Sequence, residues 1–187
     1  VNIGKKAKVK KITFLGNKIY KDSKLRGIIT SEEYKFWKII SGKKFLNKNL
    51  VNLDTRLLKN FYLNNGYYNV QINSSFAKLI NKDEFEIIFN INPENKIYFR
   101  NFNLDIPSDF DQDNFNNLKV IFEELKGKPY SFLAIDKILE EINKITSEEQ
   151  YQSTKASVIE STESDKIDLN FKIQETEKFY VEKINIF

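Results

Sequence analysis

The chain contains no cysteine and no histidine among its 187 residues, and it has only 3 prolines and 1 tryptophan. Without cysteine it can form no disulfide and carry out no thiol chemistry. Without histidine it lacks the commonest general base and the commonest transition-metal ligand of proteins. A glycine-rich phosphate loop is missing too, with only 6 glycines in the sequence. We therefore predict that the protein is not an enzyme and that it holds no cofactor and no metal.

Long apolar runs and methionine are absent as well. No stretch reaches the ~20 consecutive apolar residues that a membrane-spanning helix needs. Because methionine does not occur, there is no initiator residue, and we expect the sequence to be an excerpt of a longer protein.

Charge is plentiful but unevenly distributed. Residues 1–92 carry 18 Lys and Arg against 7 Asp and Glu, whereas residues 93–187 carry 12 against 19. The basic half is suited to acidic partners or anionic head groups. The alternative interpretation is a solvated surface that binds nothing.

The chain repeats itself. Residues 91–104 and 173–186 share the same order of apolar, charged and aromatic positions, 82 residues apart, and a weaker copy opens the chain. Tandem modules are typical of scaffolds and binding surfaces. We predict two units and the ends of two neighbours: 1–6 (tail of a preceding unit), 1–92, 93–175 and 176–187 (first strand of a following unit).

Both units show the same succession of hydrophobic patterns. Alternating apolar residues predict strands, and apolar stripes at i, i+3 and i+4 predict helices. The first unit is expected to contain strands at 8–15, 68–78 and 84–91 and helices at 22–29 and 48–64. The second is expected to contain strands at 98–104, 152–161 and 166–174 and helices at 113–125 and 132–146. The loop between the first two helices holds the tryptophan, Trp37.

This β-α-α-β-β order predicts an α+β fold. Two helices return the chain to its start, so the second strand runs antiparallel to the first, and the third fits between them by the crossover rule. Each unit is then a three-stranded mixed sheet covered on one face by two antiparallel helices. The second strand lies at an edge, where a foreign strand can be added, unless a neighbour covers it. In the first unit the candidate strand-binding residues are Val70, Gln71, Ile72, Asn73, Ser74, Ser75 and Phe76.

One acidic segment has the opening spacing of a calcium loop: Asp109, Asp111 and Asp113. That loop needs a glycine at its sixth position and a bidentate glutamate at its twelfth, where this chain has Asn114 and Val120. We interpret the segment as acidic capping of the helix that follows, because the helix dipole favours negative charge there.

A basic cluster near the start of the chain raises the possibility of nucleic-acid binding. It comprises Lys5, Lys6, Lys8, Lys10 and Lys11, with aromatic residues available at Tyr67, Tyr68 and Trp37. Lys10, however, shares a strand with core residues, and the second unit is acidic. We therefore predict no nucleic-acid partner.

Several segments resemble the POTRA domain. The strand that ends in a Gly-Asn turn (Ile12–Asn17), the helix end before an alternating strand (Phe61–Tyr68) and the Lys-x-Tyr links (Lys96–Tyr98, Lys178–Tyr180) all fit its pattern. The Trp-containing loop Glu32–Phe45 is similar to an insertion in the third module of BamA-type outer-membrane assembly factors. The whole chain resembles their third and fourth modules, although the second unit lacks the Gly-Asn turn.

The resemblance implies a periplasmic arm attached to a C-terminal membrane β-barrel that lies outside this sequence. Such an arm binds unfolded outer-membrane protein precursors by strand addition and docks accessory lipoproteins. The docking residues implied here are Lys8, Lys10, Lys11 and Trp37. The implied hinge between the units is Pro93, Glu94, Asn95 and Lys96. The alternative is a passive spacer or docking scaffold in a related POTRA-containing transporter.

Overall fold

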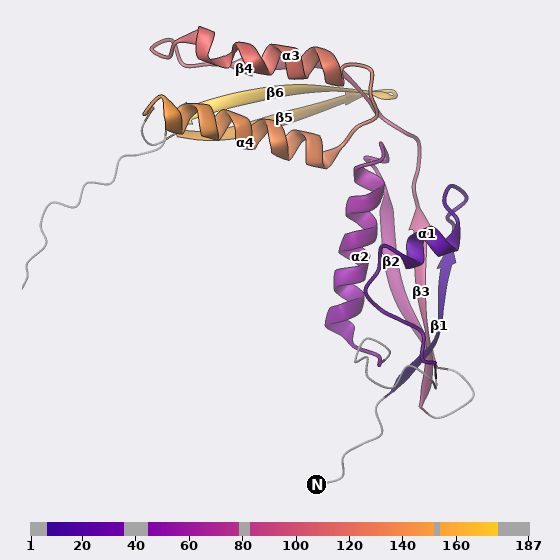
Figure 1. The fold of residues 1–187 in the computed structure, drawn as a ribbon. Helices are drawn as coiled ribbons and strands as arrows, with labels where there is room; N and C mark the ends of the chain where they lie inside the picture. Colours follow the sequence, from indigo (N-terminus) through magenta and orange to yellow (C-terminus); the bar gives the residue numbers. More distant parts are fainter. Residues whose placement is uncertain (1–6, 36–44, 79–82, 152–153, 176–187) are drawn as a thin grey trace, which may run out of the picture. The chain divides into compact units, whose positions relative to one another are not determined.

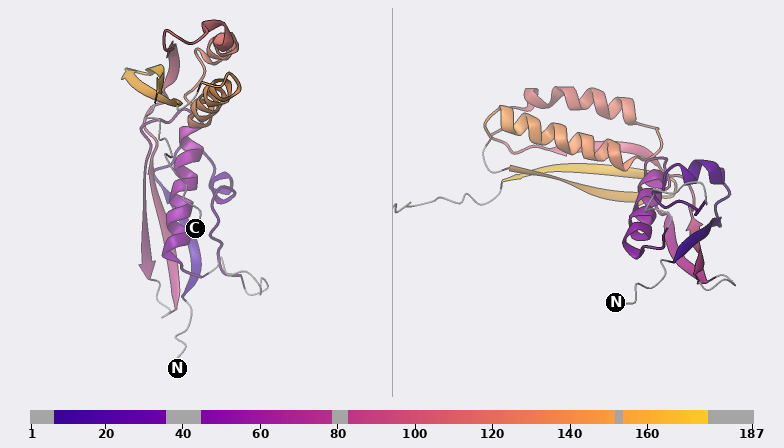
Figure 2. Two further views of the ribbon diagram at one scale, coloured as in Figure 1. Left: turned by 90° about the vertical axis from the view of Figure 1, so that its left-hand side faces the viewer. Right: turned by 60° about the horizontal axis from the view of Figure 1, so that its bottom comes forward.

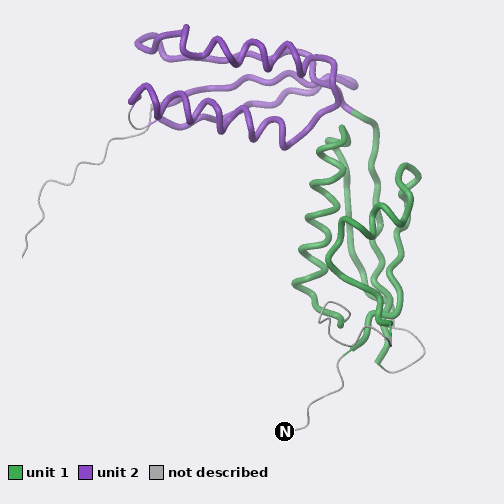
Figure 3. The backbone as a smooth tube through the Cα atoms, in the orientation of Figure 1, with its two compact units in different colours: residues 1–96 green, residues 97–187 purple. Residues whose placement is uncertain are grey.

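The computed structural model describes residues 7–35, 45–78, 83–151 and 154–175. It divides the chain into two compact units, 1–96 and 97–187 (Figure 3). The predicted tail of a preceding unit, the predicted first strand of a following one and Trp37 lie outside the described residues.

The first unit has one helix pair and one sheet (Figure 1). Its elements are β1 (Lys8–Leu15), α1 (Asp22–Arg26), α2 (Lys48–Leu63), β2 (Gln71–Lys78) and β3 (Glu84–Asn92). The strand order is β1-β3-β2, with β1 parallel and β2 antiparallel to β3. The last strand in sequence is therefore the central strand of the sheet, as the crossover rule predicts.

The second unit repeats this arrangement. Its elements are β4 (Tyr98–Asp105), the 3-10 helix η2 (Gln112–Phe115), α3 (Asn116–Leu125), α4 (Phe132–Glu148), β5 (Thr154–Glu163) and β6 (Lys166–Glu175). The strand order is β4-β6-β5, and α3 and α4 lie side by side over one face of the sheet (Figure 2). The predicted α+β fold of tandem β-α-α-β-β units is confirmed.

The core of each unit lies between its helices and its sheet. Alternate residues of the central strands are buried: Ile87, Phe89 and Ile91 in unit one, and Ile167, Leu169 and Phe171 in unit two. The helices supply the other half, from α2 (Val51, Leu58, Tyr62), α3 (Leu118, Phe122) and α4 (Ile135, Ile138, Ile142). The intervening residues Asn90, Asp168 and Asn170 are polar, whereas Ile88 is apolar and half-buried, so the other face of each sheet is mostly wet.

Side chains cap the longer helices where the sequence suggests. Asn47 accepts hydrogen bonds from two main-chain N–H groups in the first turn of α2. Ser131 accepts one from Ala134 N at the start of α4. Asp111 caps η2 by accepting from Asp113 N at 3.0 Å, which fits the capping interpretation of the acidic segment.

The first helix is shorter than predicted. The stripe of Leu25, Ile28 and Ile29 suggested a helix to residue 29, but α1 ends at Arg26. The carboxylate of Asp54, fully buried on α2, accepts hydrogen bonds from the N–H groups of Thr30 and Ser31. This contact holds the chain in a non-helical path, in which Ile28 and Ile29 still pack on the core.

Candidate functional site

The two sheets have four edge strands: β1 and β2 in unit one, β4 and β5 in unit two. An edge strand offers main-chain N–H and C=O groups that have no strand partner. Along a strand these groups point alternately toward and away from the neighbour, with the same period as the side chains. The four edges differ in how far their own unit already occupies these groups.

The edge of β1 is covered by main chain at its start. Tyr34 N donates a hydrogen bond to Val9 O at 2.6 Å, and Leu46 N donates to Ala7 O at 2.9 Å. A bridge also pairs Lys8 with Phe45 in antiparallel fashion. Tyr34, Phe45 and Leu46 of the connection between the helices therefore lie beside β1 and take the place of a partner strand.

Further along β1, two charged side chains occupy the main-chain groups of Ile12. Its N–H donates to Glu33 Oε1 at 3.0 Å, and its C=O accepts from the guanidinium of Arg26. Arg26 and Glu33 are themselves paired, with Nη1 and Oε1 2.7 Å apart. We name Arg26 and Glu33 the β1 plug, because together they fill the positions that a paired strand needs.

The edge of β2 has no such cover. The strand pairs with β3 along its whole length, from Gln71 opposite Asn92 to Lys78 opposite Phe85. On its other side, no hydrogen bond joins its main chain to another group in the described part of unit one. Phe76 is 42% exposed on this strand.

The equivalent edge in unit two is partly closed by a side chain. Ala156 N on β5 donates to Asn143 Oδ1 of α4 at 3.3 Å, so Ala156 directs its main-chain groups away from β6. Ala156 lies opposite Ile173. In unit one the corresponding pair is Ile72 opposite Ile91, so the main chain of Ile72 also points outward.

The residue that closes β5 has no counterpart in unit one. Asn143 stands twelve residues after the cap Ser131, and the same count from the cap Asn47 reaches Lys59. A lysine ammonium has no acceptor for an N–H group. The edge of β2 is therefore more open than that of β5.

The edge of β4 is covered at its start only. Phe99 N donates to Lys128 O at 3.0 Å, and Phe99 O accepts from Gly127 N at 2.8 Å. Tyr130 N donates to Ile97 O at 2.9 Å. From Phe102 onward no group of the described residues bonds to its outer side. Half of this edge is thus available.

The predicted strand-binding residues lie almost entirely on β2. Gln71, Ile72, Asn73, Ser74, Ser75 and Phe76 belong to the strand, in the register given above. Val70 precedes it, is buried, and donates its N–H to Tyr67 O at 3.2 Å. Val70 therefore has no free donor, and the first outward main-chain groups available on the strand are those of Ile72.

The lysines predicted to dock an accessory protein are engaged within unit one. Lys10 Nζ lies 3.7 Å from Glu84 Oε1, and Lys11 Nζ lies 3.1 Å from Glu86 Oε1. The hydroxyl of Thr13 and the ammonium of Lys11 both donate to Glu86, which holds the pKa of that carboxyl below its usual range. Lys8 Nζ stands 4.6 Å from the centre of the Tyr34 ring. These charges are therefore largely balanced by neighbouring groups.

The predicted hinge follows β3. Glu94 has φ = 55°, a left-handed conformation that is uncommon outside glycine. Lys96 Nζ lies 5.3 Å from the centre of the Tyr67 ring, so the end of the segment contacts unit one. The hinge itself stays a prediction.

Neither metal nor membrane-spanning features occur in the part of the chain that the structure describes. It holds no group of three or more acidic residues arranged to bind a metal ion. None of its helices is both long and apolar enough to cross a membrane.

Sequence reasoning missed the residues that open or close the edges. Arg26, Glu33 and Asn143 lie on exposed or half-buried positions with no motif around them. The sequence holds one indirect signal for them. The two units share one pattern, and they differ in residue type at these positions.

Comparison with known proteins identifies the class. Residues 7–94 match the model of the POTRA family, described as surface antigen variable number repeat. This segment corresponds to unit one, and unit two repeats its strand order. Unit one therefore matches the POTRA family.

Curated relatives give the type. The chain is 29% identical to the outer membrane protein assembly factor BamA of Buchnera aphidicola, covering 98% of this chain and 30% of that protein. It is 26% identical to BamA of Neisseria meningitidis, covering 100% of this chain and 24% of that protein. The chain thus spans less than a third of the length of these relatives. Its POTRA domains are of the BamA type.

Solved structures agree on the fold. POTRA3-5 of Haemophilus influenzae BamA is similar with a TM-score of 0.69 at 18% identity, covering 91% of this chain and 67% of that one. BamA of Haemophilus ducreyi lacking POTRA domains 1-3 is similar with a TM-score of 0.64 at 15% identity, covering 90% and 29%.

Proposed function

We propose that this chain is part of the periplasmic POTRA arm of an outer-membrane β-barrel assembly protein. In that role it binds unfolded outer-membrane protein precursors by adding their strands to β2, as a binding scaffold rather than an enzyme. The observation that supports this proposal is the bare outer side of β2, beside three other edges that are covered wholly or in part. The names of the curated relatives, outer membrane protein assembly factors, support the same role.

Strand addition suits a general assembly factor, because main-chain hydrogen bonds do not depend on the sequence of the client. Ile72, Ser74 and Phe76 share one face of β2 and, by the equivalence with Ala156, direct their N–H and C=O groups outward. Two bonds for each of three residues, at a net ~1 kcal/mol each, give about 6 kcal/mol. The cost of association is ~4–15 kcal/mol, so binding is expected to be weak and quickly reversible. That is what a client in transit requires.

The proposal includes docking of accessory lipoproteins and attachment to a C-terminal membrane β-barrel. Lys10 and Lys11 support the docking part, because their side chains are 54% and 61% exposed. A partner that binds there competes with Glu84 and Glu86 for the two ammonium groups. Docking at these residues is therefore expected to weaken with rising salt. The segment 93–96 is proposed as a hinge of limited range.

The test is amide-resolved NMR of the whole 1–187 chain titrated with a peptide copied from an outer-membrane β-strand. We expect shift changes at residues 71–78 at millimolar peptide. Ser74→Pro removes an outward N–H group and leaves the ladder to β3 intact, so it should abolish the shifts in a folded protein. Ser75→Pro is the matched control, because the N–H of Ser75 points toward β3, where Ile88 is its partner. That variant should lose stability instead.

The second candidate is a passive spacer or docking scaffold in a related POTRA-containing transporter. The ion pairs that balance the lysines of β1 favour it, because they describe a surface without an evident ligand. Shift changes nowhere on β2, with Ser74→Pro indistinguishable from the parent chain, would establish the spacer and refute strand addition.

A further inference from the structure

The first strands of the two units are built alike, down to the same irregularity. The register of β1 against β3 shifts between Val9 and Lys11, and that of β4 against β6 shifts between Phe99 and Phe102. After the shift, Ile12 lies opposite Ile87 and Phe102 lies opposite Leu169. Ile87 and Leu169 are 82 residues apart, the offset of the repeat. Ile12 and Phe102 are therefore equivalent positions.

At this position the two units differ. The main chain of Ile12 points away from β3, because its N–H and C=O bond to the β1 plug. The equivalent N–H and C=O of Phe102 point away from β6 for the same geometric reason. No plug reaches them: in the described residues no side chain or main-chain group bonds to the outer side of Phe102 or Leu104. The same edge is closed in unit one and bare in unit two.

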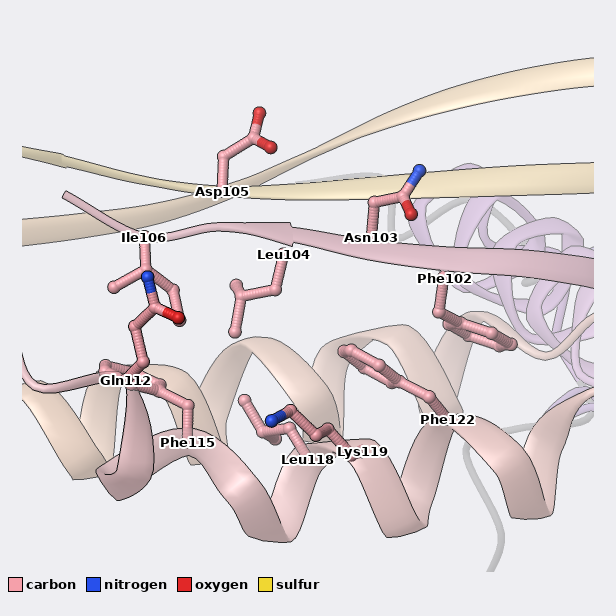
Figure 4. A pocket seen from close by; sticks show the side chains of 10 residues that line it. All are labelled: Phe102, Asn103, Leu104, Asp105, Ile106, Gln112, Phe115, Leu118, Lys119 and Phe122. Carbon is pink, nitrogen blue, oxygen red and sulfur yellow. The ribbon is translucent and has the colours of Figure 1, made fainter. Parts of the chain in front are cut away.

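A groove takes the place of the plug. It lies between β4 and α3, has a volume of about 530 Å³, and is floored by apolar side chains: Phe102, Leu104, Phe115, Leu118 and Phe122 (Figure 4). A second hollow of about 440 Å³ shares Phe102, Asn103, Lys119 and Phe122 with it and continues to Asn101 on β4 and to Lys126 at the end of α3. The hollow therefore runs beside the bare main chain, as an added strand would.

The side chains of β4 show what each face of an added strand would meet. In Figure 4, Phe102 and Leu104 point toward α3, whereas Asn103 and Asp105 point to the opposite side of the strand. An added strand would thus place alternate residues against an apolar floor and the others beside an amide and a carboxylate.

The charge beside the groove selects the sign of those polar residues. Asp105 is 58% exposed, and Lys172 Nζ is 3.9 Å from it. The charged residues that line the groove are Asp105 on β4 and Lys119 on α3, and Lys119 Nζ donates to Asn116 Oδ1 of its own helix at 2.7 Å. Directly opposed residues on neighbouring strands stabilise each other when their charges are opposite. A basic residue on the polar face of the incoming strand is therefore favoured.

We propose that the Phe102–Asp105 edge and its groove form a second strand-accepting site, which takes an extended segment with alternating apolar and polar residues and a Lys or Arg beside Asp105. The proposal shares with the proposed function the idea of an extended ligand, but it concerns a different edge in a different unit. The two therefore succeed or fail separately.

The experiment titrates the full 1–187 chain with the capped peptide Thr-Leu-Thr-Phe-Lys-Leu-Thr and follows amide shifts. We expect changes at residues 102–106 and along α3. Two further peptides carry N-methyl groups, one on the apolar positions and one on the polar positions. One of them should lose binding and the other keep it, because only one set of N–H groups faces β4. The set that matters also gives the direction of the added strand.

Charge exchange tests the polar face. Asp105→Lys should weaken binding of the lysine peptide about two- to fivefold, and a peptide with Glu in place of Lys should recover it. Glu140→Lys, on an exposed position of α4, is the control for net charge. Shifts at residues 71–78 alone would overturn this site and leave the proposed function standing. Equal binding by both N-methylated peptides, or by the Asp105 and Glu140 variants, would overturn it as well.

Discussion

The β1 plug makes a quantitative prediction about stability. Glu33 Oε1 accepts from Ile12 N at 3.0 Å and from Arg26 Nη1 at 2.7 Å, and Glu33→Ala removes both bonds. A hydrogen bond to a charged group contributes about 1.5–3 kcal/mol. The ion pair adds little, because the side chains of Arg26 and Glu33 are 37% and 28% exposed. We expect a loss of about 2 kcal/mol from unit one, or roughly 10 °C in its melting temperature.

Amide hydrogen exchange is the suitable assay, because it reports each unit separately. In Glu33→Ala the amide of Ile12 should exchange faster than those of its neighbours in the β3 ladder. Glu33→Gln is the matched control: it keeps an acceptor for Ile12 N and loses only the charge toward Arg26. Its cost should be less than half that of the alanine variant.

The same variant tests the comparison between the units. With Glu33 gone, the N–H of Ile12 is as bare as that of Phe102, although Arg26 still donates to its C=O. The alternating lysine peptide should therefore begin to shift amides from Ile12 to Phe14, more weakly than those of β4. An Ile12 amide that exchanges as slowly as before, together with a stability change below about 0.5 kcal/mol, would refute the reasoning.

Two further predictions concern unit one. Gly16 has φ = +75°, and a Cβ there would lie 2.4 Å from Ile91 O, so Gly16→Ala should cost about 1–3 kcal/mol; an unchanged urea midpoint would contradict this. Burial raises the pKa of Tyr62, so the folded state holds this proton more tightly and stability falls as the pH rises above about 10. Tyr62→Phe loses the bond to Asn17 Oδ1, about 1 kcal/mol, but should flatten that alkaline decline in urea titrations; a decline as steep as in the parent chain would exclude Tyr62 as its source.

Local patterns were sufficient to predict the elements. Ile12 and Phe14 on one face, followed by the Gly16-Asn17 turn, placed β1 at residues 8–15, the bounds that the structure has. The predicted helix at 48–64 corresponds to α2. Its apolar stripe lies within the segment itself and its capping residue, Asn47, directly precedes it, so both are local features of the sequence. The strand order followed from the element order and the crossover rule alone.

The state of each edge could not be predicted in this way. Glu33 is 21 residues from the main chain that it closes and Arg26 is 14, so neither shows a periodic signal. Asn143 and Lys59 stand at equivalent positions of two similar helices. The sequence shows that one has an acceptor and the other has none, but only the structure shows that this position faces the main chain of an edge strand. The short α1 has the same origin, since a buried carboxylate from a distant helix overrides the apolar stripe.

The central position of the last strand has a consequence for how the protein is made. In unit one β3 pairs with both β1 and β2, which do not pair with each other, and its partnership with β1 joins residues 8 and 84. No part of that sheet can exist before residue 84 has emerged during synthesis or export. Because pairing of such distant segments is slow, each unit is expected to fold late and in one step. Until β3 is available, β1 and β2 of unit one have no partner. A protein that is proposed to bind unpaired strands therefore exposes two unpaired strands of its own during folding.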